Sequence, residues 1–258
     1  MGNAPRQKRI QFHSFYSRAV EDVTVREMAC GNAAQPAQLV ARARAGSNVT
    51  YHWSPWLPSH RGPMTSYLAP YAGDLASVDL NALRFFKIAE DALHADGTWS
   101  TDKLIADKGL WTTAIPADIK PGSYVLRHEL TALHFATESS NYKYFGGVIP
   151  APQFYISCYA LNVTGGGAAE PKGETFPGAY KAGEPGLVVD IFNRLDGYQI
   201  PGPPVYRAST PGPALKENPL VVVSPTGDPV EDEKYNKKVL AAVGLLGATG
   251  SFFNSIGG

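Results

Sequence analysis

Hydrophobic and polar residues alternate most regularly between Tyr124 and His134, and this run predicts a β-strand. One face of the strand carries Tyr124, Leu126, His128, Leu130, Ala132 and His134, and the other carries Val125, Arg127, Glu129, Thr131 and Leu133. A second run begins at Gln153 and places Gln153 and Tyr155 on one face, with Phe154 and Ile156 on the other. Two predicted strands therefore hold two His, one Gln and one Tyr on definite faces.

Two interpretations of these polar side chains are open. They form a site in which they hydrogen-bond to one another or bind a ligand, because polar groups on strands of a folded protein need partners. Alternatively, they lie on a strand face that is open to water, as one face of an antiparallel sheet often is. The residues of the two runs do not choose between these interpretations.

Further short runs have the period of a strand and end at turn residues. They cover residues 10–15, 39–45, 48–53, 64–69, 111–115, 159–164 and 186–192. The stretch 79–93 has mixed helical character, and 85–90 within it is also compatible with a strand. The chain contains 26 Gly and 21 Pro, which favours turns and short strands over helices. We therefore predict an all-β fold, a β-sandwich of about ten strands.

Composition changes along the chain and predicts three parts. Residues 1–9 are basic and polar, and we expect them to be disordered or the product of a wrongly joined gene. Residues 10–208 form the predicted sandwich, and the Pro- and Gly-rich stretch 209–258 is a predicted linker and tail. Within this tail, 234–246 is compatible with a short helix, and the segment from 239 onward is too polar and Gly-rich for a membrane span.

Charge and cysteine content narrow the class of protein. The 258 residues include 23 basic and 23 acidic side chains, so nothing in the charge suggests nucleic acid as a partner. The two cysteines, Cys30 and Cys158, form no CxxC motif. They are compatible with a disulfide in a secreted protein or with two free thiols in the cytosol.

The amino terminus and a sequon bear on the compartment. No apolar segment typical of a signal peptide follows Met1, so we expect either an intracellular chain or a start that was lost or replaced. Asn48-Val49-Thr50 is a glycosylation sequon, which matters only if the protein is secreted.

Several motifs in a fixed order resemble the fungal lytic polysaccharide monooxygenases of auxiliary activity family nine, formerly glycoside hydrolase family sixty-one. The resemblance covers about residues 10–206. The motifs lie at Asp22–Thr24 with Cys30, His60–Pro63, Lys103–Gly109, Tyr124–His134, Gln153–Tyr155 with Cys158, Val163–Gly167, Phe176–Lys181 and Ile200–Tyr206.

The resemblance implies an immunoglobulin- or fibronectin-III-like β-sandwich with long loops that binds one copper ion through a histidine brace. In this family the brace consists of an N-terminal His and a second His, which maps to His60. Tyr155 maps to the axial position, and His134 and Gln153 map to the pair that hydrogen-bonds the oxygen species. The resemblance also implies a disulfide between Cys30 and Cys158, and therefore a secreted protein.

The implied activity is the hydroxylation of cellulose or a related β-1,4-glucan at C1 or C4 by a monomer, using an external electron donor with hydrogen peroxide or oxygen. The family places an exposed Tyr near the closing segment against the glucan. Tyr198 is the candidate here, because sugar faces stack on aromatic rings, and Tyr206 and Tyr16 are weaker candidates.

The sequence departs from the family in three places. The N-terminal His and about two dozen residues expected before Ile10 are absent, Arg61 replaces a Pro, and residues 138–152 lengthen the spacing between His134 and Gln153. We expect either a truncated gene or a relative that has lost the redox site and acts as a carbohydrate-binding or cell-wall-associated protein.

Other assignments for the polar residues remain open beside the resemblance. Taken alone, His60 in its Pro-rich loop and His134 are compatible with solvated surface residues, and Tyr155 with a core Tyr. We expect a structural role for His128 with Arg127 and Glu129, and a surface or core position for His13, His52 and His94. A glycoside hydrolase needs two paired carboxylates, and neither Glu129 nor Glu138 has an evident partner.

Overall fold

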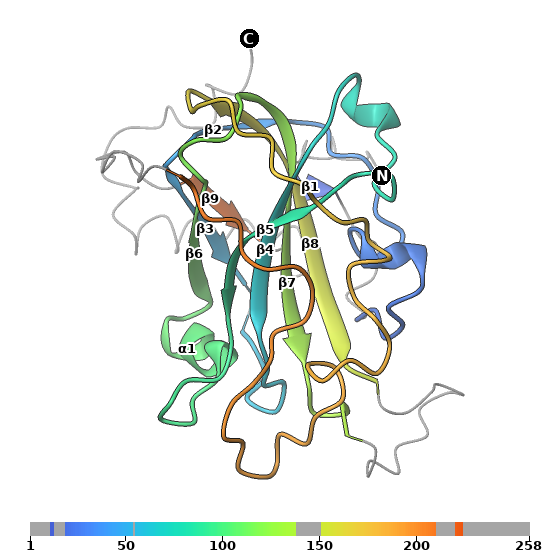
Figure 1. The fold of residues 1–258 in the computed structure, drawn as a ribbon, viewed down its shortest axis with the longest axis vertical. Coiled ribbons are helices and arrows are strands. Elements are labelled where there is room, and N and C mark those ends of the chain that lie inside the picture. The colour runs from blue at the N-terminus through green and yellow to red at the C-terminus, as the bar shows by residue number, and fades with distance from the viewer. Residues whose placement is uncertain (1–10, 13–18, 54, 138–150, 210–219, 224–258) are drawn as a thin grey trace, which may run out of the picture.

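The computed structural model describes residues 11–12, 19–53, 55–137, 151–209 and 220–223, and the regular secondary structure of this part is mostly strand (Figure 1). The strands are β1 Gln11–Phe12, β2 Ala41–Arg44, β3 Asn48–His52, β4 Met64–Pro70, β5 Phe86–Asp91, β6 Leu110–Ala114, β7 Gly122–Ala132, β8 Gln153–Thr164 and β9 Leu220–Val223. The helical elements are the short helix α1, Ser100–Ala106, and the 3-10 turns Arg26–Met28 and Leu75–Ser77.

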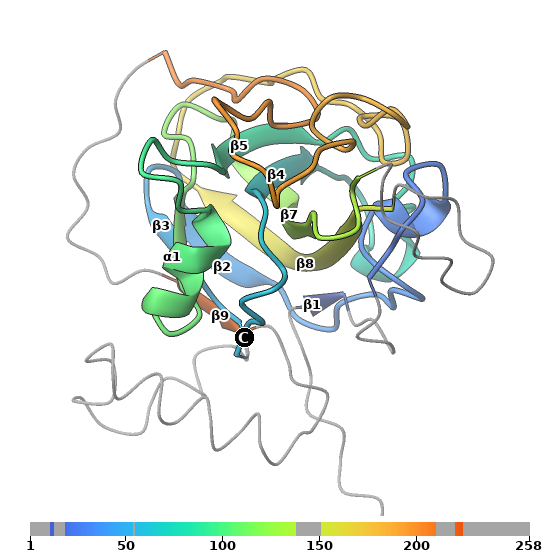
Figure 2. The ribbon, with the colours of Figure 1, turned by 90° about the horizontal axis from the view of Figure 1, so that it is seen from below.

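The strands form two open sheets, and the predicted β-sandwich is confirmed (Figures 1 and 2). The larger sheet has the order β1-β8-β7-β4-β5, with β2 pairing parallel to β8, and the smaller has the order β6-β3-β9. Side chains from β3 in the small sheet and from β4, β7 and β8 in the large sheet make up one core cluster. This shared apolar layer holds the two sheets together.

β7 and β8 pair antiparallel from Gly122 opposite Val163 to Ala132 opposite Gln153, as their alternating patterns predict. Every residue from Tyr124 to Leu133 is buried, so the water-exposed interpretation of this strand is wrong. One face packs in the core between the sheets. The other face is covered by the segments around Met28 and Phe176, which form a second core cluster with Val125.

A buried ion pair between Arg127 and Glu129 lies on this second face, and both side chains are inaccessible to solvent. Arg127 also donates to the carbonyl oxygens of Met28 and Ala29, and its guanidinium lies 3.9 Å from the ring centroid of Phe176. Glu129 Oε1 accepts hydrogen bonds from Thr131 and Tyr180. The pair therefore joins β7 to the loops that cover it, and its predicted structural role is confirmed.

His128, on the opposite face, is also a core residue. Its ring stacks on Tyr51 of β3 with 3.8 Å between centroids and 8° between planes. Burial lowers the pKa of His128 to about 3, so the imidazole is neutral and contributes to the contact between the sheets.

The Cys30–Cys158 disulfide is present, as the family resemblance implies. It connects residues 128 positions apart and attaches the segment after the first 3-10 turn to the middle of β8. A cross-link over so long a loop restricts the unfolded chain and so stabilises the fold.

The predicted strand at 186–192 is wrong. The amide groups of Leu187 and Val188 both donate to the carbonyl of Glu184, so the chain turns here instead of extending. Its apolar residues pack separately: Leu187 joins the cluster beneath β7, whereas Val189 and Ile191 pack near Leu133. A run of hydrophobic residues in a turn that covers a core has the same composition as a buried strand.

Helix α1 was not predicted, and the ambiguous stretch 85–90 is strand β5, which pairs with β4. The carboxylate of Asp102 accepts a hydrogen bond from the amide of Trp99, which caps the helix. β9, within the stretch predicted as linker and tail, pairs parallel with β3. The predicted helix at 234–246 and most of the predicted strand at 10–15 lie outside the described residues. In the described part of the chain no helix is long and apolar enough to span a membrane.

Replacement of Arg127 by Met is expected to lower the free energy of unfolding by about 3–5 kcal/mol, because it leaves the buried Glu129 carboxylate without its cation. Urea denaturation with the disulfide intact measures this loss. The double variant Arg127→Met, Glu129→Leu is expected to recover most of it, since neither charge is then buried alone. A loss below about 1 kcal/mol for the single variant would contradict this role of the pair.

Candidate active site

The candidate site lies at the edge of the large sheet where β7 ends and β8 begins. Ala132 is opposite Gln153 in this antiparallel pair, so His134, two residues beyond Ala132, is brought near Gln153 and Tyr155. The loop 55–63, which carries His60, precedes β4, and Met64 of β4 is opposite Leu130 of β7. Strand register thus brings three distant segments of the chain to one end of the sandwich, at the bottom of Figure 1.

The four residues singled out in the sequence are neighbours in the fold. The ring centroids of His60 and His134 are 4.2 Å apart, and those of His60 and Tyr155 are 6.0 Å apart. The Tyr155 hydroxyl donates to Gln153 Oε1 at 3.1 Å. All four side chains are partly exposed, so the group is accessible from solvent.

Backbone hydrogen bonds hold the His60 loop against the end of β7. The amide of Thr131 donates to the carbonyl of Pro63, and the amide of Leu133 donates to that of Arg61. A Cβ atom at Gly62 would collide with the carbonyl oxygen of Thr131, so the loop approaches β7 at a distance that only glycine permits.

Helix α1 holds the same loop from the other side. Ser100 Oγ donates to the carbonyl of Gly62, and the Gly62 amide donates to Thr101 Oγ1. The Arg61 side chain is ion-paired with Asp102 at 3.1 Å. The position of His60 is therefore fixed from two sides.

Trp56, for which the sequence suggested no role, packs against two of the three rings of the site. Its indole lies edge-on to Tyr155 at 4.9 Å and to His60 at 5.9 Å between centroids. Its Nε1 donates to the carbonyl of His60 at 2.9 Å. Its position four residues before His60 within the loop 55–63 is the one sequence signal that pointed to it.

Glu21 was also missed. Its carboxylate accepts a hydrogen bond from Gln153 Nε2 at 2.9 Å, because a bridge between Val20 and Phe154 brings the two segments together. Gln153 thus donates to Glu21 and accepts from Tyr155, which fixes the orientation of its amide. No pattern in the sequence links Glu21 to a residue 132 positions away.

Burial sets the protonation states of His60, His134 and Tyr155. Burial lowers the pKa of His60, and burial together with the proximity of His60 lowers the pKa of His134 to about 4. Burial, with the negative charge of Glu21, raises the pKa of Tyr155. At neutral pH both imidazoles are therefore neutral and the phenol is protonated. A neutral imidazole is the form that binds a metal ion.

The donor set fits a nitrogen-binding metal ion such as copper, for which imidazole is a suitable ligand. Nδ1 of His60 is paired with the Ser59 hydroxyl at 3.0 Å, and Nδ1 of His134 is buried without a hydrogen-bond partner among the described residues. No cluster of three or more His, Cys, Asp or Glu suited to a metal occurs in that part of the chain. The described residues therefore offer two neighbouring imidazoles, those of His60 and His134, with no third such side chain grouped beside them.

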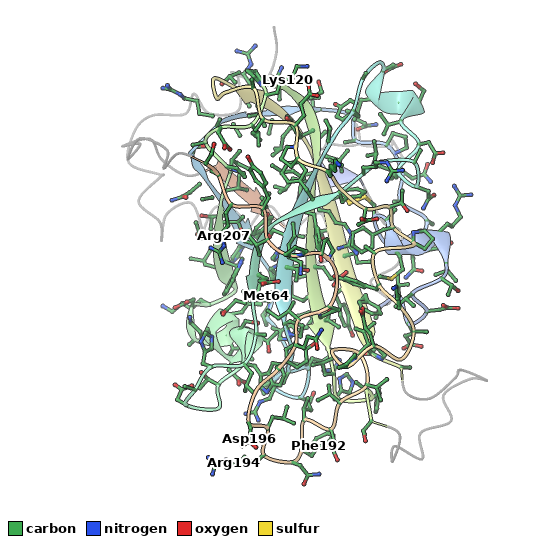
Figure 3. All side chains as sticks on the ribbon, in the orientation of Figure 1. Met64, Lys120, Phe192, Arg194, Asp196 and Arg207 are labelled. Carbon is green, nitrogen blue, oxygen red and sulfur yellow. A yellow bond between two sulfur atoms is a disulfide. The ribbon has the colours of Figure 1, made fainter. Side chains whose placement is uncertain are left out.

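Two large hydrophobic side chains are exposed near the site. Phe192 is 74% exposed and Leu57, in the His60 loop, is 58% exposed. Figure 3 shows Phe192 beside Arg194 and Asp196 at the same end of the molecule as the end of β7. The amide of Val189 donates to the carbonyl of Ala136, which attaches the Phe192 segment to the chain just beyond His134.

Tyr198, predicted to contact the substrate, is largely packed inside. Its ring lies edge-on to Trp99 at 5.0 Å, and its hydroxyl donates to the carbonyl of Gly186 at 2.6 Å. Its contact with substrate stays a prediction. The Tyr206 hydroxyl donates to Asp118, and Tyr16 lies outside the described residues.

The remaining His and Glu candidates are buried or paired with other residues, or they lie outside the described residues. His52 is buried in β3, and His94 pairs with Asp91 at 3.1 Å. Glu129 is enclosed in its ion pair, so it is not available as a hydrolytic carboxylate. His13 and Glu138 lie outside the described part of the chain.

Comparisons with known proteins point to one family. The sequence model of Auxiliary Activity family 9 (formerly GH61) matches residues 2–199. The chain is 44% identical over 214 residues to AA9 family lytic polysaccharide monooxygenase C of Geotrichum candidum, an alignment that covers 80% of this chain and 38% of that protein. The chain spans between 38% and 62% of the length of the four Geotrichum candidum relatives that it matches.

Solved structures agree with the fold. The extended catalytic domain of H. jecorina LPMO9A has a TM-score of 0.70 and 30% identity, with 83% of this chain and 86% of that one covered. A cellulose-active polysaccharide monooxygenase from M. thermophila has a TM-score of 0.65 and 30% identity, with 79% and 90% covered.

Replacement of Gly62 by Ala is expected to cost about 1–3 kcal/mol in the free energy of unfolding, because the added methyl group forces the His60 loop off β7. Thermal or urea denaturation measures the loss. Gly197→Ala is the matched control, since a Cβ atom there meets no atom within 4 Å. Equal stability of the two variants would show that the close approach is unimportant.

Proposed function

Because the chain belongs to Auxiliary Activity family 9, we propose that it is a copper-dependent lytic polysaccharide monooxygenase that cleaves cellulose or a related β-1,4-glucan oxidatively. The reaction hydroxylates C1 or C4 of the glucan, with an external electron donor and hydrogen peroxide or oxygen as co-substrates. The enzyme acts outside the cell as a monomer. One observation carries the proposal: His60, His134, Gln153 and Tyr155 gather at one solvent-accessible end of the sandwich.

His60 and Tyr155 are the proposed copper-binding residues of the described chain. The neutral imidazole of His60 would bind the ion, and the phenol of Tyr155, whose ring centroid is 6.0 Å from that of His60, would lie beside it as a weak ligand. Copper, when bound, supplies the one-electron chemistry that activates the co-substrate. The family's brace takes its remaining nitrogen ligands from an N-terminal His, which the described residues do not include.

His134 and Gln153 are the proposed positioning pair. The ring of His134 is partly exposed at the site, and the amide of Gln153 is held between Tyr155 and Glu21. Fixed polar groups of this kind hold the co-substrate and supply or accept its proton without reorganising. Trp56 packs against His60 and Tyr155 and excludes water from that side of the site.

The exposed ring of Phe192 suggests where the substrate binds. We assign the stacking contact with a glucose unit to Phe192, because an apolar ring exposed this far is suited to the apolar face of a sugar. Tyr198, which is partly exposed, stays a second candidate contact, and its hydrogen bond to Gly186 and its packing on Trp99 hold the segment in place. Cellulose as the substrate is supported by the relative from M. thermophila, which is described as cellulose-active.

A redox-inactive carbohydrate-binding or cell-wall-associated protein is the alternative function. The observation in its favour is the exposed ring of Phe192, because stacking on a glucan needs no metal ion. Such a protein would keep the Phe192 surface and bind glucan without copper.

Calorimetric titration of the secreted protein, with its mature amino terminus, by Cu(II) separates the two functions. We expect one tight copper site per chain and the release of oxidised oligosaccharides from cellulose in the presence of a reductant. His60→Ala is expected to weaken copper binding at least about 100-fold, whereas the control His94→Ala leaves it unchanged. Glucan binding with no tight copper site would favour the alternative.

Replacement of Phe192 by Ala is expected to weaken binding to cellulose about 2–10-fold, because it removes the exposed ring. Adsorption isotherms on cellulose measure the change. Phe192→Tyr keeps the ring and is expected to bind as the unmodified protein does. Unchanged binding of the Ala variant would rule out this contact.

A further inference from the structure

Two glycosylation sequons lie in the sheets and play no part in the site. Asn48-Val49-Thr50 begins β3, and Asn162-Val163-Thr164 ends β8. The asparagine of each is exposed, whereas the valine of each is buried in the core between the sheets. The alternation of a strand therefore directs both asparagine side chains away from that core.

Both sequons lie at the end of the sandwich opposite the candidate site. Asn162 is nine positions beyond Gln153 on β8, which corresponds to about 30 Å along the strand. Asn48 is brought close to it by β2, whose last residue Arg44 is opposite Thr164. A tight turn at Gly46 and Ser47 then leads to Asn48. In Figure 1 this end is at the top, and the start of β8 is at the bottom.

We propose that Asn48 and Asn162 are both N-glycosylated, so that two glycans cover the end of the sandwich away from the candidate site. An oligosaccharide is transferred from a polyprenyl pyrophosphate donor to the side-chain amide nitrogen. A bond forms between that nitrogen and the anomeric carbon, while the bond from this carbon to the pyrophosphate oxygen breaks. The amide loses a proton, and polyprenyl pyrophosphate leaves.

The surroundings of each asparagine accommodate a large polar group. The residue opposite Asn48 in β6 is Ala114, which is small and exposed. Asn162 lies between Arg42 of β2, which is exposed, and Ser123 of β7, which is partly exposed. Neither attachment requires a buried side chain to move, so the fold tolerates the modification.

The burial of Thr50 determines when Asn48 can be glycosylated. Its hydroxyl is hydrogen-bonded to Thr112 at 2.8 Å, and the residue is 6% exposed in the folded protein. A transferase that needs this hydroxyl reaches it only before β3 pairs with β6. The glycan on Asn48 is therefore attached to the unfolded chain during secretion, before the protein folds.

The proposal rests on the secretory passage that is part of the proposed function. The Cys30–Cys158 disulfide supports that passage independently, because such bonds form in oxidising compartments. With the glycans about 30 Å from Gln153, a flat polysaccharide docked at the opposite end does not meet them. Enzymatic removal of the glycans is accordingly expected to leave glucan oxidation within about 2-fold, a difference below about 0.5 kcal/mol.

Secretion of the full chain from a yeast host, followed by peptide mass spectrometry, tests the assignment. Release of the glycans by an amidase converts each occupied Asn to Asp, and we expect this conversion at positions 48 and 162. Asn48→Gln and Asn162→Gln are each expected to remove one of two glycan steps on a gel. Asn193→Gln is the matched control, because Asn193 is also exposed but is not part of a sequon.

Thr164→Ala removes the second sequon while keeping Asn162, and it is expected to abolish glycosylation there. An unmodified Asn at either position in the secreted chain overturns the assignment for that residue. Oxidised Cys30 and Cys158 in the same spectrum show that secretion itself succeeded. Copper binding is measured separately, so a failure of the glycan assignment is distinguished from a failure of the proposed function.

Discussion

The close approach of the His60 loop to the end of β7 is the contact on which the candidate site depends. Gly62 touches the backbone of Thr131, and the amides of Thr131 and Leu133 donate to Pro63 and Arg61. On the other side of the loop, Ser100 and Thr101 of α1 are hydrogen-bonded to the backbone of Gly62. Two rings that are 74 positions apart in the chain, those of His60 and His134, are brought together by this packing.

The loop can rest on β7 because β7 is itself held rigidly. Both of its faces are buried, one against the small sheet and the other against the loops near Met28 and Phe176. Burial of Arg127 and Glu129 would be costly for either alone, and their ion pair with the hydrogen bonds from Tyr180 and Thr131 offsets that cost. Arg127 and Glu129 on the second face thus stabilise the fold, whereas the polar residues at the ends of β7 and β8 form the candidate site.

Much of this arrangement could be predicted from local patterns. A strict period of two revealed β7 and β8, and the family motifs pointed to His60, His134, Gln153 and Tyr155, which the fold brings together. The burial of both faces of β7 could not be predicted, because the covering segments come from residues more than 40 positions away. The turn at 186–192 has the hydrophobic content of a strand, and only the hydrogen bonds to Glu184 distinguish the two. Glu21 and Phe192 depend on tertiary packing for their positions, so no local signal identified them.

The central claim is that the imidazole of His60 lies against the imidazole of His134 in the folded protein. Nuclear Overhauser spectroscopy of the protein with labelled histidine and tyrosine tests it most directly, because the effect falls steeply with distance between protons. The structure predicts cross-peaks between the ring protons of His60 and His134, whose centroids are 4.2 Å apart. Their absence, with the cross-peaks between His128 and Tyr51 present as the internal standard, would contradict the account.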